Sequence, residues 1–183
     1  MTHVALLRGI NVGRAKRIAM ADLRALVAKL GYGNVRTLLN SGNVVFDVPS
    51  SRRGDPAARL EEAMTNALGV SARVTVLSAA DLAKVVAKNP FATVATDPAR
   101  YLVGFLKEPG HAKRLAVLAG KSWKPEALAV GPGVVYLWCA GGILESAILS
   151  SASRLLGDAI TTRNWTTVTK LLALASEVPA AGE

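Results

Sequence analysis

The beginning of the chain constrains the fold most, because it has the order of a buried strand, a polar loop and a helix. An apolar run, Val4–Leu7, stops at Arg8, and a polar, basic loop with Asn11 and Lys16 leads into a helical pattern near Ala19. A short continuous apolar run is typical of a strand that is buried in a sheet. A strand, a glycine-containing basic loop and a helix start, in this order, often form an anion site.

The spacing of apolar residues extends this start into a complete subdomain over residues 1–78. A helix is expected over residues 19–30, and Asp55 followed by Pro56 marks the start of a second helix, which Gly69 ends. The expected strands are residues 4–8, 35–39, 44–48 and 73–77, with a tight hairpin at Asn40–Asn43 between the second and the third. The resulting order, β-α-β-β-α-β, is that of a ferredoxin-like fold.

Residues 79–183 predict a second α+β subdomain. Strands are expected at 101–106, 127–130 and 134–139, and helices at 79–88, 110–120, 144–156 and 165–176. After a bridging helix, 79–88, the order is therefore β-α-β-β-α-α, which partly repeats the first subdomain. We predict an α+β protein in which a ferredoxin-like subdomain packs on this second subdomain, because no low-complexity linker separates them.

The charge of the chain favours an acidic partner. The 183 residues are 51% hydrophobic and 19% charged, so the chain can bury a core, and its formal net charge is +9. Such an excess favours nucleic acid or a phosphorylated small molecule, although a basic protein can also simply be soluble. Two stretches contain basic residues and no acidic one: the loop between Arg8 and Arg17, and the segment between Glu108 and Glu126.

Several classes of site are disfavoured by composition. With one cysteine, Cys139, and two histidines, the chain offers neither an intrachain disulfide nor a metal site, and no cofactor is indicated. The loop glycines match neither a P-loop nor a dinucleotide fingerprint. No pair of carboxylates or Ser-His-Asp set is marked out for catalysis. No signal peptide or membrane span is recognisable, so we expect a cytoplasmic protein, and the oligomeric state stays open.

The predicted topology brings two polar loops together. In a β-α-β-β-α-β sheet, the end of the first strand and the hairpin between the second and third strands lie at the same edge. This places Arg8, Asn11 and Lys16 near Ser41 and Asn43. Each of these residues can serve a turn alone, but together they form a candidate ligand site, since binding residues concentrate on loops that a rigid scaffold holds.

A second polar cluster precedes the last predicted helix. Thr162, Arg163 and Asn164 stand directly before Trp165, where Asn164 can cap the helix and Arg163 can attract an anion. We predict that the segments 8–17, 40–43 and 161–165 form one polar region in or beside a cleft between the subdomains. Arg8 should be held by backbone carbonyls or a carboxylate, because an unpaired charge is costly at depth.

Three motifs resemble a bacterial family called domain of unknown function 1697. They are Ala5–Gly13, Ser41–Phe46 and Thr161–Trp165, the last followed by Val168–Leu171. The resemblance covers nearly the whole chain and implies a ferredoxin-like first part and a related second α+β part, but no activity and no catalytic residue. The chain departs from the family pattern at Arg14, often glycine, and at Ala147, commonly lysine. If that lysine serves a ligand, the second part contributes less to a site here.

Three functional hypotheses therefore stay open. The first is a binding module for a phosphate-bearing partner, either nucleic acid or a nucleotide-like molecule. The second is an enzyme for a small anionic substrate in the cleft between the subdomains. The third is a structural or protein-interaction role, in which the motifs serve the fold alone.

Overall fold

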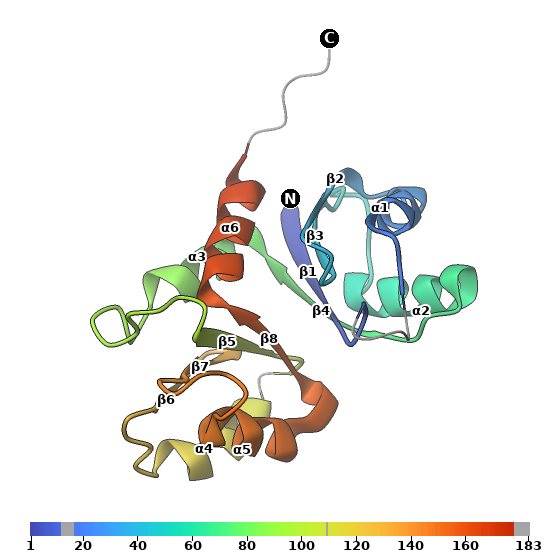
Figure 1. Ribbon diagram of the computed structural model, residues 1–183. Helices are drawn as coiled ribbons and strands as arrows, with labels where there is room; N and C mark the ends of the chain where they lie inside the picture. The colour runs from blue at the N-terminus through green and yellow to red at the C-terminus, as the bar shows by residue number, and fades with distance from the viewer. Residues whose placement is uncertain (12–16, 109, 178–183) are drawn as a thin grey trace. The chain divides into compact units, whose positions relative to one another are not determined.

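The computed structural model describes residues 1–11, 17–108 and 110–177, which form two compact units (Figure 1). Unit 1 consists of Met1–Leu82 together with Leu171–Glu183, and unit 2 consists of Ala83–Lys170. The chain passes from one unit to the other within helix α3 (Ala79–Ala87) and again within helix α6 (Trp165–Ser176). The subdomain boundaries at 1–78 and 79–183 stay a prediction.

Unit 1 is a ferredoxin-like fold, as predicted. Its elements are β1 (Thr2–Arg8), α1 (Met20–Lys29), β2 (Gly33–Leu38), β3 (Asn43–Asp47), α2 (Pro56–Leu68) and β4 (Arg73–Ser78). The strands form an antiparallel sheet in the order β2-β3-β1-β4, so β1 is central. Helices α1 and α2 lie side by side over one face of this sheet (Figure 1).

The core of unit 1 follows from the alternation of side chains along the strands. Ala5 and Leu7 of β1 face the helices together with Phe46 of β3, and Leu23 of α1 and Met64 of α2 pack against them. This burial removes apolar surface from water at about 25 cal/mol per Å². It fixes the ends of β1 and α1, which carry the site described below.

Both ends of α2 have the signals that the sequence predicts. Asp55 accepts a hydrogen bond from the backbone N–H of Ala57 at the start, and Pro56 is the first helical residue. Gly69 ends the helix in the left-handed conformation, with a φ of 65°. The capping pattern is therefore confirmed in the structure.

Unit 2 contains one strand more than the sequence predicts. Its elements are β5 (Tyr101–Leu106), α4 (His111–Ala119), β6 (Ala127–Gly131), β7 (Val134–Trp138), α5 (Ala147–Leu156), a 3-10 turn (Gly157–Ala159) and β8 (Ile160–Asn164). The predicted order β-α-β-β-α-α lacked β8. This strand escaped prediction because it is polar apart from Ile160, and a strand at a sheet edge pairs on one side only, here with β5.

The two units share one topology. With β8 included, unit 2 has the order β-α-β-β-α-β, and its antiparallel sheet runs β6-β7-β5-β8, which corresponds strand for strand to β2-β3-β1-β4. The predicted α+β class is confirmed, and the partial repeat seen in the sequence is a repeat of the whole fold. No helix within the described ranges is long and apolar enough to cross a membrane.

Candidate functional site

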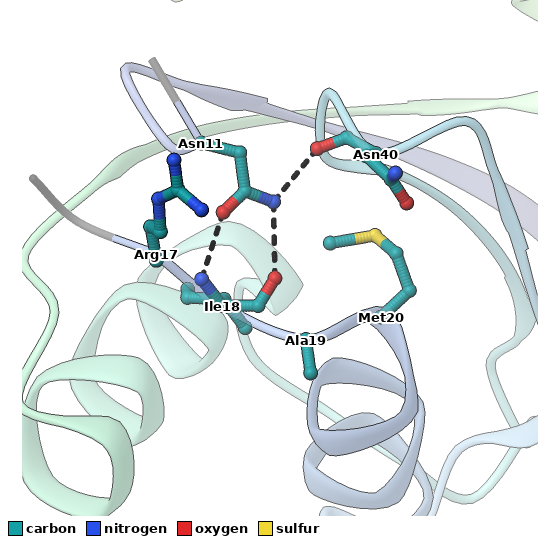
Figure 2. Close-up of a pocket in the computed structure, with 6 residues that line it drawn as sticks. All are labelled: Asn11, Arg17, Ile18, Ala19, Met20 and Asn40. Carbon is teal, nitrogen blue, oxygen red and sulfur yellow. Dashed lines mark hydrogen bonds between the residues drawn. The ribbon is translucent and has the colours of Figure 1, made fainter. Parts of the chain in front are cut away.

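The side chain of Asn11 joins the two ends of the β1–α1 connection to the neighbouring hairpin (Figure 2). Its Nδ2 donates to the carbonyl oxygens of Ile18 at 3.0 Å and Asn40 at 2.7 Å, and its Oδ1 accepts from the N–H of Ile18 at 2.8 Å. Asn11 has a φ of 55°, a region that asparagine tolerates better than most residues. Both amide N–H groups bond within the protein, so Asn11 positions the loops rather than offering donors to a ligand.

The β2–β3 hairpin is also bound to the end of β1. The N–H of Leu7 donates to the carbonyl oxygen of Gly42 at 2.8 Å. The buried Asn43 donates to the carbonyl oxygen of Leu38 at 2.9 Å and to Oγ of Ser41 at 3.0 Å. The predicted meeting of the β1 end with the hairpin is therefore confirmed. Backbone hydrogen bonds and the Asn11 amide join the two segments, and the Asn43 amide bonds within the hairpin.

A pocket of about 420 Å³ lies where these segments meet the start of α1. Its lining consists of Asn11, Arg17, Ile18, Ala19, Met20 and Asn40. In Figure 2 the side chains of Arg17 and Met20 lie on either side of the Asn11 amide. Three lining residues thus come from the segment directly before α1, one is the first residue of α1, one comes from the hairpin, and Asn11 follows β1.

The pocket has positive electrostatic character. Arg17 is exposed and is the only charged residue among the six that line it. Ala19 is the N-cap of α1, with φ −68° and ψ 138°, and no side chain makes a capping hydrogen bond there. The first N–H groups of a helix carry partial positive charge, which attracts anions. Asp22 in the first turn offsets part of this charge.

The other predicted residues of this loop are placed as follows. Arg8, the last residue of β1, is half-buried and pairs with Arg73 of β4 in the sheet register. The prediction that carbonyls or a carboxylate hold its guanidinium stays a prediction. Lys16 and Arg14 lie outside the described residues.

The cluster Thr162, Arg163 and Asn164 belongs to β8 in unit 2. Nη1 of Arg163 donates to the carbonyl oxygen of Thr162 at 2.9 Å. Oδ1 of Asn164 accepts from the N–H of Thr167 at 2.9 Å, which confirms the predicted helix cap. The next residue, Trp165, stacks on Tyr101 with ring centroids 4.8 Å apart. These three residues therefore serve a strand end and a helix start, and the predicted single region with the unit 1 loops stays a prediction.

The titratable groups of unit 2 with shifted pKa values are buried structural groups. Burial raises the pKa of Tyr101, whose hydroxyl donates to Oδ1 of Asn89 at 2.7 Å. Burial also raises the pKa of the Cys139 thiol, which keeps it protonated and unreactive at neutral pH. Among the described residues, no three His, Cys, Asp or Glu side chains gather where they could hold a metal ion.

The N-terminus of α5 already has an anion from the chain itself. Oε2 of Glu126 accepts from the N–H groups of Ala147 at 3.1 Å and Ile148 at 3.2 Å, and Oγ of Ser146 accepts from Leu149. Ala147 stands where the resembling family commonly has lysine, so the helix start here combines a carboxylate and no neighbouring cation.

Sequence reasoning missed the apolar side of the pocket and the role of Glu126. Ile18, Ala19 and Met20 looked like the start of an ordinary helix, although a helix start without a capping side chain was a usable signal. Nothing in the local sequence relates Glu126 to α5, because a long segment separates them.

Comparison with known proteins places the chain in a family without an assigned activity. The model of a family described as "Protein of unknown function (DUF1697)" matches residues 1–136. The structure is similar to that of the conserved bacterial protein SP0830 from Streptococcus pneumoniae, with a TM-score of 0.70 and 25% sequence identity over 96% of this chain and 98% of the other. No curated protein matches the chain.

Proposed function

Because the chain belongs to the DUF1697 family, whose function is unknown, we propose from its geometry that it binds a small phosphate-bearing molecule in the pocket beside α1. The main support for this proposal is the start of α1, where Ala19 and Met20 line the pocket and no side chain caps the helix. Arg17 adds a full positive charge at the same place. Helix N-termini with a neighbouring cation are common phosphate sites.

The contrast with α2 and α5 supports this assignment, whereas α4, which starts after Gly110, resembles α1 in having no capping side chain. The start of α2 is capped by Asp55, and that of α5 by Ser146 and Glu126. In those helices a side-chain oxygen from the protein already accepts the first N–H groups. At α1, Ala19 has no oxygen to offer, so a phosphate oxygen can take that role.

The dimensions and lining suit a small molecule rather than a chain. A volume of about 420 Å³ lies within the usual range of small-molecule sites. Ile18 and Met20 provide apolar contact, and Arg17 with the helix start provides the polar contact. We infer a ligand with one phosphate group and a compact apolar or sugar part. Such metabolites fit a cytoplasmic protein.

We favour a protein that binds its ligand in this pocket and does not catalyse a reaction there. The six lining residues include no carboxylate, histidine, cysteine or hydroxyl side chain that could act as a base or nucleophile. The hypothesis of an enzyme for a small anionic substrate therefore has no specific support from the lining. The structural hypothesis explains Asn11 and Asn43, whose amides bond within the protein.

Substitution of Ala19 by aspartate separates stability from binding. Aspartate is a favourable N-cap, so Ala19→Asp should raise the stability of the free protein by about 0.5–2 kcal/mol. The same carboxylate would occupy the helix N–H groups and repel phosphate. Thermal shift should therefore show a higher melting temperature for Ala19→Asp alone and no further rise with inorganic phosphate, AMP or glucose 6-phosphate, each of which is tested on the wild type.

Arg17→Gln tests the cation, with Lys29→Gln at the far end of α1 as the matched control. Arg17→Gln should weaken binding about tenfold, because a charge-assisted bond to phosphate contributes roughly 1.5–3 kcal/mol. Lys29→Gln should bind as the wild type does. If no phosphate compound stabilises the wild type, or if Ala19→Asp binds as the wild type does, the proposal is wrong.

A further inference from the structure

A second basic surface lies in unit 2, on the helix pair α4–α5, far in sequence from the pocket residues. Both helices cover the same face of the sheet and lie side by side (Figure 1). Their inner sides are anchored by Leu115 and Leu118 of α4 and by Ile148, Ala152 and Leu156 of α5, which are buried. The outer sides of the two helices consequently face solvent.

The outer side of this helix pair has charge of one sign. Neither α4 nor α5 contains an aspartate or glutamate, whereas Lys113, Arg114 and Arg154 are exposed, and Lys121 follows directly after α4. By contrast, α1 and α2 mix both signs on their solvent sides. Mixed charge is the ordinary composition of a solvated helix surface, so the exclusion of acids from α4 and α5 is a distinguishing feature.

Three of the basic residues lie near one end of the helix pair, and Lys121 lies near the other. Nη2 of Arg114 donates to the carbonyl oxygen of Leu155 at 2.5 Å, which ties the first turn of α4 to the last turn of α5. Lys113 and Arg154 are the chain neighbours of these two residues. Lys121 lies roughly two helical turns further along. The surface therefore presents cations along the length of α4.

No carboxylate neutralises these cations within the part of the chain that the structure describes. None of Lys113, Lys121 and Arg154 forms an ion pair with a residue of 1–11, 17–108 or 110–177. The acidic residues that flank the helices are Glu108, Glu126, Glu145 and Asp158. Glu126 is bound to the N-terminus of α5, and the other three lie in the turns beyond the helix ends.

We propose that the α4–α5 face binds the phosphate backbone of double-stranded nucleic acid without sequence preference. Proteins that bind single strands add aromatic platforms for the bases, and neither helix contains a phenylalanine, tyrosine or tryptophan. The exposed residues between the cations are uncharged and mostly small, Ala116, Ala119, Ala147 and Ser150, with the larger Val117 also 59% exposed, so none of them repels a phosphate. Backbone contacts alone fix position but read no sequence.

This proposal does not depend on the pocket of unit 1, since it uses other residues in another unit. Neutralising phosphates releases counterions, so binding should weaken steeply as salt rises. Each lysine or arginine that contacts a phosphate adds about one to the slope of log affinity against log salt concentration. The slope of log affinity against log salt concentration, measured on the folded, full-length protein, therefore gives the number of phosphate contacts.

The test is fluorescence anisotropy with a labelled duplex of about 20 base pairs over a range of salt concentrations. The double variant Lys113→Gln/Arg154→Gln is compared with Lys29→Gln/Lys88→Gln, which removes the same charge from exposed positions in α1 and directly after α3. The first variant should lower affinity at least about tenfold at low salt and reduce the slope by about two. The control should keep the slope of the wild type. Arg114 is left unchanged, because it joins the two helices.

Four outcomes would overturn the proposal. They are no binding of the duplex by the wild type at low salt, an equal loss of slope in both variants, tighter binding of a single strand than of the duplex, and binding of phosphatidylserine vesicles in place of the duplex. Circular dichroism and melting temperature verify that both variants are folded. A loss of affinity for the duplex can then be assigned to the substituted residues of the α4–α5 face.

Discussion

The two units have the same order of strands, but they differ in the connection that follows the first strand. In unit 2, β5 is joined to α4 by residues 107–110 alone. In unit 1, β1 is joined to α1 by residues 9–19, and the Asn11 side chain bonds to both backbone groups of Ile18. The pocket is lined from this longer connection. A shared topology thus supplies the scaffold, and the loop supplies the candidate site.

In both units the first helix, α1 or α4, starts without a capping side chain, and the second helix, α2 or α5, starts with one. The N-terminus of α5 is satisfied by Glu126 and Ser146, whereas no side chain caps that of α1. A carboxylate from the chain and a phosphate from a ligand are alternative solutions for the same N–H groups. The comparison therefore separates a helix start that a carboxylate of the chain occupies from the start of α1, where we propose that a phosphate binds.

The largest expected effect comes from Asn11→Ala, which removes the ties of the long connection. Three hydrogen bonds are lost and alanine is placed at a φ of 55°, so the free energy of unfolding should fall by about 3–4 kcal/mol. Asn34→Ala is the matched control, because Asn34 also has a positive φ, of 48°, but makes an exposed bond to Asp47. Urea denaturation should show a loss of only about 1–2 kcal/mol for the control. Equal losses would mean that Asn11 has no special role.

The two hairpins offer the next comparison, at glycines that directly precede β3 and β7. A Cβ on Gly42 would lie 2.7 Å from Cβ of Leu7 and 2.8 Å from Cδ1 of Ile10, whereas a Cβ on Gly133 would meet nothing within 4 Å. Both have positive φ, 79° and 70°. Gly42→Ala should therefore cost about 2–3 kcal/mol and Gly133→Ala only about 1 kcal/mol, the strain of the backbone alone. A smaller loss for Gly42→Ala in chemical denaturation would show that the hairpin is not packed tightly on β1.

Removal of the internal anion in unit 2 should have a smaller effect. Glu126→Ala leaves the N–H groups of Ala147 and Ile148 without their carboxylate, which should lower stability by about 1–2 kcal/mol. Glu62→Ala, an exposed position within α2, should change stability by less than about 0.5 kcal/mol. Thermal denaturation of both variants checks the difference, and a neutral Glu126→Ala would remove the parallel between the two helix starts.

The smallest effect concerns the acid sensitivity of unit 1. The hydrogen bond from Asn34 lowers the pKa of Asp47, partial burial opposes this, and the bond from Thr2 adds to it. Because the folded pKa is below the unfolded value near 4, the stabilisation is complete above about pH 4 and is lost as pH falls through the folded pKa. Asp47→Asn should therefore melt below the wild type at neutral pH, and the difference should shrink in acid. A difference that grows in acid would have the wrong sign.

The sequence predicted the sheet of unit 1 because its strands are apolar and its helices carry cap signals at Asp55 and Gly69. It missed β8, since the polar run after Ile160 resembles a loop and only pairing with β5 makes it a strand. The assignment of Asn11 to a ligand stays a prediction, and the structure adds that both of its amide donors bond to backbone carbonyls. The hydrogen-bond partners of Asn11 and Glu126 depend on tertiary contacts, which local sequence patterns do not contain.

The most direct test of the α1 pocket is a titration of the ¹⁵N-labelled full-length protein with AMP, followed in ¹H–¹⁵N correlation spectra. The account predicts saturable shifts of the backbone N–H groups of Arg17, Ile18, Met20 and Asn40, all at one dissociation constant, and the loss of these shifts in Ala19→Asp. Inorganic phosphate should shift the same signals more weakly. Saturable shifts confined to Lys113, Lys121 and Arg154 in unit 2, or no saturable shift at the start of α1, would contradict it.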